Sequence, residues 1–73
     1  MTEMNINKPL FPNLEGETAK KGLNRKTLGQ AVGLSPNQMS NRWNGEVEFT
    51  LDEVIKIAEV LENSVEYLFQ RSK

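Results

Sequence analysis

The sequence predicts an all-α protein, a compact bundle of about five short helices. Apolar residues recur at helical spacing along most of the chain, several of these segments begin with a good N-cap residue and stop at a glycine, and no segment alternates as a strand does. A chain of 73 residues has room for one small domain. We expect a flexible N-terminal arm over residues 1–9 and a folded domain over residues 10–73.

The residue types that are missing narrow the possible functions. The chain contains no cysteine and no histidine, which excludes a disulfide, argues against a zinc site and removes most groups that act as bases or nucleophiles at neutral pH. We therefore expect no enzymatic activity, no metal, no cofactor and no small-molecule ligand. No apolar run reaches about 18 residues and no signal-peptide pattern is present, so we expect a cytoplasmic protein with no membrane partner.

The first predicted helix covers residues 12–21. Leu14 points inward, and Glu15 and Glu17 lie in the early turns, where the helix dipole favours acidic residues. Gly22 follows at a position that suits the end of a helix.

The second predicted helix begins after Asn24, a favourable N-cap residue, and ends at Gly33. Leu28 and Val32 are four residues apart, so they lie on one face. Gly29 lies beside Leu28, and its missing side chain would let another helix approach closely.

The third predicted helix, residues 36–43, has clear signals at both ends. Ser35 is a good N-cap, Pro36 suits the first helical position, and Gln38 completes a capping box with Ser35. Asn44 and Gly45 form a pair that ends the helix. Only Gly33-Leu34-Ser35 separate this helix from the one before it, which is the connection length of a helix-turn-helix.

The last two predicted helices supply much of the core. Thr50 and Glu53 form a capping box for the fourth helix, and Phe49 and Val54 occupy the positions of a hydrophobic staple. We expect its core face to contain Leu51, Val54, Ile55, Ala58 and Leu61. Ser64 caps a short fifth helix, in which Val65, Leu68 and Phe69 can turn inward.

The third helix carries the pattern that points to a function. At about 100° per residue, Asn37, Ser40, Asn41 and Asn44 share one side of it, Gln38 and Arg42 flank that side, and Met39 and Trp43 face the opposite way as core residues. Asn pairs well with adenine, Ser with several bases and Arg with guanine. An uncharged polar stripe of this kind suits base edges in the major groove.

Plainer interpretations of the same residues remain open. Gln38 can serve the capping box alone, which we favour over a base contact, and Asn44 beside Gly45 is typical of a helix end. Asn37 and Asn41 can be ordinary surface residues.

The charge is distributed unevenly along the chain. Up to Gly45 the sequence has six basic and three acidic residues, and from Glu46 onward it has three basic and seven acidic residues, so halves of +3 and −4 make up the net charge of −1. Such an asymmetry indicates a basic face on one part of the fold and an acidic face on another. Two ordinary surfaces that differ by chance are the alternative.

The chain resembles the phage-repressor type of helix-turn-helix, the lambda repressor-like or Xre/Cro family. The resemblance covers about residues 14–69 and rests on KGLNRKTLGQAVGLSPNQMSNRWNG followed by FTLDEVIKIAEVLENSVEYLF. The second string is similar to the last two helices of short regulators from phages and bacterial mobile elements. The order and spacing of these segments across five helices are what make the resemblance specific.

The resemblance implies roles at matching positions. Leu28, Val32, Leu34 and Met39 match buried positions, and Gly29 matches the small residue where two helices cross. We expect contacts to bases from Ser35, Asn37, Gln38, Ser40, Asn41 and Arg42, and contacts to phosphates from Lys20, Lys21, Asn24, Arg25, Lys26 and Asn44.

Three positions depart from the family pattern. Arg42 stands where many members have an apolar core residue, and we expect Trp43 to take over that packing. Pro36 occupies a position that often carries a base-reading side chain. Glu46 stands where Lys or Arg is common beside the DNA backbone, which puts one phosphate contact in doubt.

These observations lead us to expect a sequence-specific regulator that binds double-stranded DNA. Residues 36–43 would enter the major groove, and a homodimer on a palindromic operator would repress transcription in the nucleoid of a phage host or a cell that carries a mobile element. The alternative is a protein-interaction module, antitoxin-like or binding a recombinase or polymerase, with weak or no DNA contact. The slight net acidity and Glu46 favour this alternative to a small degree.

Overall fold

The computed structural model describes residues 9–72, and this part of the chain contains five α-helices and no strand, which confirms the predicted all-α class. The helices are α1 Pro12–Lys20, α2 Arg25–Val32, α3 Pro36–Trp43, α4 Leu51–Leu61 and α5 Val65–Leu68. Residues 1–8 of the predicted arm lie outside the described residues. No helix among those described has the length and apolar character that crossing a membrane requires.

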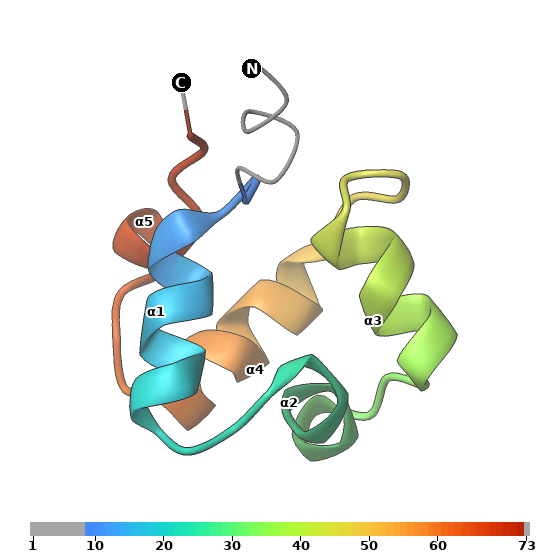
Figure 1. The fold of residues 1–73 in the computed structure, drawn as a ribbon, viewed down its shortest axis with the longest axis horizontal. Helices are drawn as coiled ribbons and strands as arrows, with labels where there is room; N and C mark the ends of the chain where they lie inside the picture. Colours follow the sequence, from blue (N-terminus) through green and yellow to red (C-terminus); the bar gives the residue numbers. More distant parts are fainter. Residues whose placement is uncertain (1–8, 73) are drawn as a thin grey trace, which may run out of the picture.

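The helices form two groups joined by α4. Helices α1 and α5 pack together at one side of Figure 1, and α2 and α3 pack together at the other. Helix α4 contacts both α2 and α5 and lies between the groups. This arrangement leaves α3 at the edge of the molecule, where one side of it faces solvent.

The helix ends follow the predicted capping chemistry. Asn24 is the N-cap of α2, where its side chain accepts a hydrogen bond from Thr27 N–H at 2.9 Å, and Thr27 returns one by accepting from Asn24 N–H at 2.8 Å. Ser64 caps α5 by accepting from Tyr67 N–H at 3.1 Å. Helix α2 ends at Gly33, whose φ of +84° is a conformation that glycine adopts without strain.

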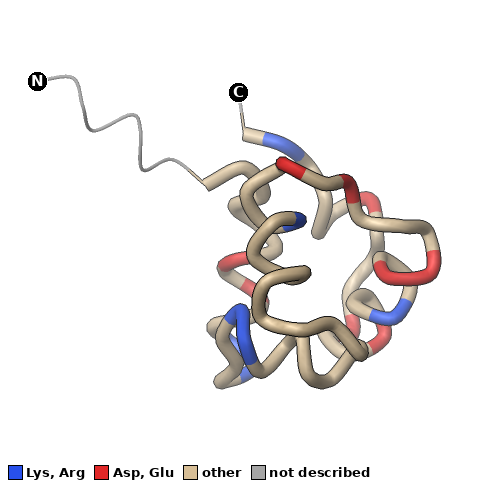
Figure 2. Tube along the Cα trace, turned by 90° about the vertical axis from the view of Figure 1, so that its right-hand side faces the viewer, with Lys and Arg blue, Asp and Glu red and all other residues tan. Residues whose placement is uncertain are grey.

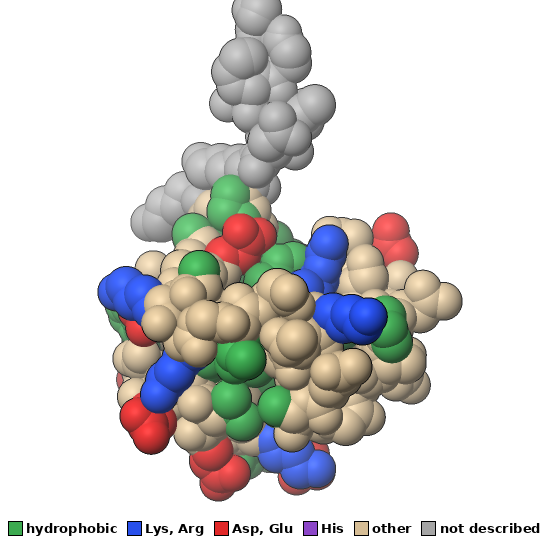
Figure 3. All heavy atoms as spheres, turned by 60° about the horizontal axis from the view of Figure 1, so that its bottom comes forward, with side chains coloured by type: hydrophobic (Ala, Val, Ile, Leu, Met, Phe, Trp, Pro, Cys, Tyr) green, Lys and Arg blue, Asp and Glu red, His purple; other side chains and the backbone are tan. Residues whose placement is uncertain are grey.

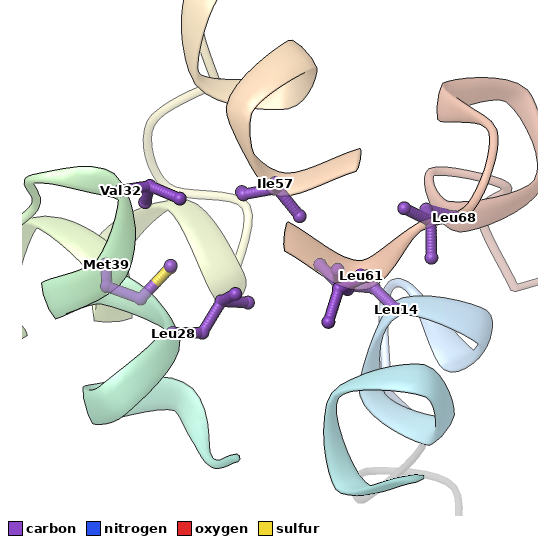
Figure 4. Packing of buried hydrophobic residues seen from close by; sticks show 7 residues of the cluster. All are labelled: Leu14, Leu28, Val32, Met39, Ile57, Leu61 and Leu68. Carbon is purple, nitrogen blue, oxygen red and sulfur yellow. The ribbon is translucent and has the colours of Figure 1, made fainter. Parts of the chain in front are cut away.

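The core joins the two groups of helices. Its buried members are Leu14, Leu28, Val32, Met39, Ile57, Leu61 and Leu68. In Figure 4, Leu28, Val32 and Met39 lie together at one end, Leu14, Leu61 and Leu68 lie at the other, and Ile57 of α4 lies between them. Each helix supplies at least one of these residues.

The predicted core face of α4 is wrong at two positions. Leu51 is 74% exposed and Ile55 is 43% exposed, whereas Ile57, which the predicted face omitted, is fully buried. The buried residues of α4 are Ile57 and Leu61, with Ala58 and Val60 partly buried beside them, and Leu51 and Ile55 lie on a neighbouring stripe of the same helix. Both stripes are apolar, so the spacing alone does not identify the one that meets α2.

The two helices of the helix-turn-helix cross closely at Gly29. A Cβ atom placed there would lie 3.2 Å from Met39 Cβ and 3.3 Å from the carbonyl oxygen of Leu34. The missing side chain therefore brings α3 against α2, as predicted, and Met39 fills the space beneath it.

Three phenylalanines from distant parts of the chain form a second cluster. Phe11 precedes α1, Phe49 precedes α4 and Phe69 follows α5, and their ring centroids are 5.2 to 6.0 Å apart in edge-to-face arrangements. The Arg71 guanidinium lies 5.8 Å from the centre of the Phe11 ring. The cluster ties both ends of the described chain to the segment between α3 and α4.

Candidate nucleic-acid interface

The solvent-facing side of α3 is polar and, apart from Arg42, uncharged. Asn37 and Asn41 are exposed, Ser40 is half-buried, and Met39 is fully buried on the opposite side. Figure 2 faces this side of the molecule and shows a helix with a single basic position, followed by acidic positions in the segment that leads to α4.

The first turn of α3 uses two of the predicted site residues for capping. The hydroxyl oxygen of Ser35 accepts a hydrogen bond from Gln38 N–H at 3.1 Å, and Gln38 Oε1 accepts from Ser35 N–H at 2.9 Å. Gln38 thus has a structural role, and only its amide N–H groups remain available for another partner. Asn37 and Asn41 make no side-chain hydrogen bond to another described residue, so their amides are free to both donate and accept.

The side chain of Arg42 turns into the protein. Its Nε donates to Glu53 Oε1 at 2.7 Å and its Nη1 donates to the carbonyl oxygen of Gln38 at 3.1 Å. The side chains of Arg42 and Glu53 are each only 15% exposed. The guanidinium therefore has partners within the protein, in contrast to the two asparagines.

Trp43 packs against the core as predicted and also makes a polar contact. Its indole N–H donates to Glu15 Oε2 of α1 at 3.1 Å. Trp43, Glu15, Asn24, Arg25 and Asn44 are among the residues that line an open groove of about 970 Å³. The groove brings the start of α2 and the end of α3, two of the segments predicted to contact phosphate, to one place.

The basic residues that we predict to contact phosphate differ in whether they already form an ion pair within the protein. Arg25 and Lys26, in the first turn of α2, are exposed and form no ion pair with another described residue. Lys20 is bridged to Glu17 at 3.2 Å, and Lys21 is bridged to Glu62 at 3.0 Å. These bridges are exposed and therefore weak, so both lysines can still exchange partners.

The two oppositely charged halves of the sequence mix in the folded chain. Of the five basic residues between Thr18 and Gly45, Lys21 and Arg42 pair with Glu62 and Glu53 of the acidic half. On the face that Figure 3 shows, the Lys and Arg side chains are separate spots among acidic, hydrophobic and other atoms, not one continuous basic patch. The structure therefore has no broad basic face among the described residues, and the free positive charge lies near the start of α2, at Arg25 and Lys26.

The segment after α3 folds back onto the helix. The carbonyl oxygen of Asn41 accepts hydrogen bonds from Glu46 N–H at 2.9 Å and Val47 N–H at 3.2 Å. Gly45, at φ +85°, makes the turn. The backbone of Glu46 is therefore fixed relative to that of Asn41.

A family model for the Cro/C1-type HTH DNA-binding domain matches residues 13–72. The chain belongs to this family. The match covers α2 to α5 in full and α1 from its second residue, and it confirms the predicted helix-turn-helix and the resemblance to Xre/Cro regulators. A comparison with curated proteins gives no match. The chain is thus a Cro/C1-type DNA-binding domain in which α2 and α3 form the helix-turn-helix.

Sequence reasoning missed two polar contacts at the end of α3 in this Cro/C1-type domain. The Arg42–Glu53 and Trp43–Glu15 contacts join residues that are 11 and 28 positions apart. The departure of Arg42 from the family pattern was the available signal, because a charged side chain at an apolar position needs a buried partner. Helical spacing gave no indication that Glu53 would supply it.

Proposed function

We propose that this Cro/C1-type domain is a sequence-specific transcriptional regulator, a repressor of phage or mobile-element type, and that α3 reads bases in the major groove. The observation that carries this proposal is the uncharged polar side of α3, with the amides of Asn37 and Asn41 exposed and free. Asn41 and Asn37 recognise base edges, and Ser35 and Ser40 add shorter contacts. Arg42 is not assigned a base contact because its guanidinium has partners within the protein. Ser35 and Gln38 share the capping box, so only their donor groups, a hydroxyl hydrogen and the amide N–H groups, remain for bases.

Phosphates on either side of the reading helix are bound by Asn24, Arg25 and Asn44, which line the groove at the start of α2, and by lysines near it. Arg25 and Lys26 supply positive charge, while Asn24 and Asn44 supply polar groups. Lys20 and Lys21 join them by exchanging their surface ion pairs for phosphate. These contacts hold the protein on the duplex but do not select a sequence.

We further propose a homodimer on a palindromic site, because one module of this size buries limited DNA surface. Support comes from the exposed apolar stripe of α4, Leu51 and Ile55, beside an open hollow lined by Ala58 and Val65. Substitution Ile55→Glu is expected to abolish dimerisation in sedimentation experiments while the monomer stays folded. A dimer that survives this change would contradict the assignment of the stripe.

Selection of bound duplexes from a random pool is the decisive test of the proposed function. We expect one enriched motif with two-fold symmetry. Asn41→Ala should relax the preference at one position per half-site by about 1–3 kcal/mol, whereas Glu66→Ala, an exposed change on α5, should leave the motif unaltered. A pool without an enriched motif, together with recovery of a protein partner in a pull-down, would favour the interaction module instead.

A further inference from the structure

The attachment of α3 to the rest of the fold is one-sided. Its helix–helix packing is mainly with α2. The fully buried Met39 and the partly buried Trp43, which also contacts Glu15 of α1, anchor it along one side. A helix held along one stripe can roll about its own axis. With side chains reaching about 5–6 Å from the axis, a roll of about 10° moves their tips by about 1 Å. A displacement of that size is enough to break a hydrogen bond to a base edge, because the donor–acceptor distance of a hydrogen bond varies over only a few tenths of an ångström.

The Arg42–Glu53 contact opposes such a roll. The Nε atom of Arg42 donates to Glu53 Oε1 at 2.7 Å, and Nη1 donates to the carbonyl oxygen of Gln38 one turn earlier in α3 at 3.1 Å. The guanidinium thus spans the last turn of α3 and reaches the first turn of α4. Both side chains are largely buried, so solvent screens the contact less than it screens the exposed pairs.

The carboxylate of Glu53 is itself fixed in place. Glu53 Oε1 also accepts a hydrogen bond from Thr50 N–H at 3.0 Å, and Thr50 Oγ1 accepts from Glu53 N–H at 3.2 Å. This capping box ties the acceptor of Arg42 to the N-terminus of α4. The last turn of α3 is therefore joined to a point on α4 that cannot rotate freely.

We infer that Arg42 is a positioning residue, which acts through Glu53 to fix the rotation of α3 and so aligns Asn37 and Asn41 with the bases, without contacting DNA itself. This inference rests on the proposed function. It goes beyond that function because it gives Arg42, the charged residue of α3, a role in the contact with Glu53 and not in binding DNA.

A double-mutant cycle on the selected duplex tests the inference. Glu53→Gln removes the charge but keeps a side chain that completes a capping box, and Arg42→Met keeps an unbranched side chain. We expect each single change to lower the ratio of affinities for the selected and a scrambled duplex by on the order of ten-fold. The double variant should be no worse than either single variant, because both changes break the same contact.

Asp52→Asn is the matched control, because it removes one acidic charge from the same turn of α4 at a side chain that is 82% exposed. This control should leave the ratio unchanged. If Arg42→Met loses the same affinity in the Glu53→Gln background as in the wild type, Arg42 contacts DNA directly and the inference is wrong.

A second measurement on the free protein does not depend on DNA. In NMR spectra, Arg42→Met and Glu53→Gln should shift the side-chain amide signals of Asn37 and Asn41 and speed the hydrogen exchange of α3, while Asp52→Asn should do neither. Unchanged signals would overturn the positioning role even if the wild type selects a motif. If the wild type selects no motif but the signals shift, the proposed function fails and the internal contact stands.

Discussion

Two glycines inside helices have opposite surroundings. A Cβ atom at Gly16 of α1 would have no neighbour within 4 Å, whereas a Cβ atom at Gly29 would press on Met39 and on the backbone of Leu34. Of the two, the sequence predicted only Gly29 as a position where another helix comes close. Gly16 therefore only lowers the helix propensity of α1, whereas Gly29 makes room for α3.

Replacing Gly16 by alanine should therefore stabilise the protein by about 0.5–1 kcal/mol, because alanine loses less backbone entropy in a helix. Gly29→Ala has the same intrinsic gain but must displace the buried Met39, and we expect a net loss of about 1–3 kcal/mol. Urea unfolding of the two variants measures the contrast. Equal gains at both positions would show that the crossing has room for a methyl group.

Glu53 should make stability depend on pH in the acid range. Partial burial works against ionisation, but the hydrogen bond from Thr50 and the contact with Arg42 outweigh it and hold the pKa of this carboxyl below its usual range. A lowered pKa in the folded state contributes stability at pH values above the unfolded pKa, about 4.3, and this contribution is lost as the pH falls through the folded value.

The stability difference between the wild type and Glu53→Gln should accordingly be full near pH 7 and should shrink as the pH falls below about 4.3. Chemical unfolding at several pH values measures it. A difference that stays constant down to pH 3 would show that the charge of Glu53 adds no stability.

At the scale of the helices, the N-caps of α2 to α5 could be predicted, whereas the side of α4 that faces the core could not. The caps Asn24, Ser35, Thr50 and Ser64 act within three residues, so local sequence contains all the information that they need. The exposure of Leu51 and Ile55 depends on where α2 and α5 cover α4, which is a property of the whole bundle.

Substitutions at Ser35, the N-cap of α3, should separate an effect on stability from an effect on base preference. Ser35→Ala should cost about 1 kcal/mol of stability and should also weaken the base contact that we propose for Ser35. Ser35→Asn should retain the cap and the stability but alter the base preference. Ser64→Ala, which removes the cap of α5, should cost a similar amount in thermal unfolding without changing the DNA motif.

For the molecule as a whole, net charge is a poor guide to the candidate interface. The Asn37 and Asn41 side chains were predictable as a polar stripe, because helical spacing places them together. The pairing of Arg42 with Glu53 and the meeting of Phe11, Phe49 and Phe69 were not, because they join segments that are distant in the sequence. Tertiary contacts thus decide which of the charged residues remain free.

Binding to duplex DNA should weaken steeply with salt despite the formal charge of −1, because released counterions and not the net charge set the slope. Arg25→Ala should weaken binding to all sequences alike and reduce the salt slope by about 1. Lys56→Ala removes a basic residue that is 54% exposed on α4 and faces Asp52 at 3.7 Å, and it should leave the slope unchanged. Titrations of duplex DNA with the wild type and the two variants at several salt concentrations measure these slopes.

The tight fold of the segment after α3 has a consequence for the time course of binding. Because the Asn41 carbonyl oxygen holds the backbone of Glu46, an acidic residue stays close to the reading helix whenever that helix lies on DNA. Repulsion from the phosphates would shorten each stay on DNA by a similar factor at every sequence, so stays on random sequence, which are brief already, would become briefer still. A regulator built in this way leaves wrong sites quickly, and so it gains speed in its search at the expense of general affinity.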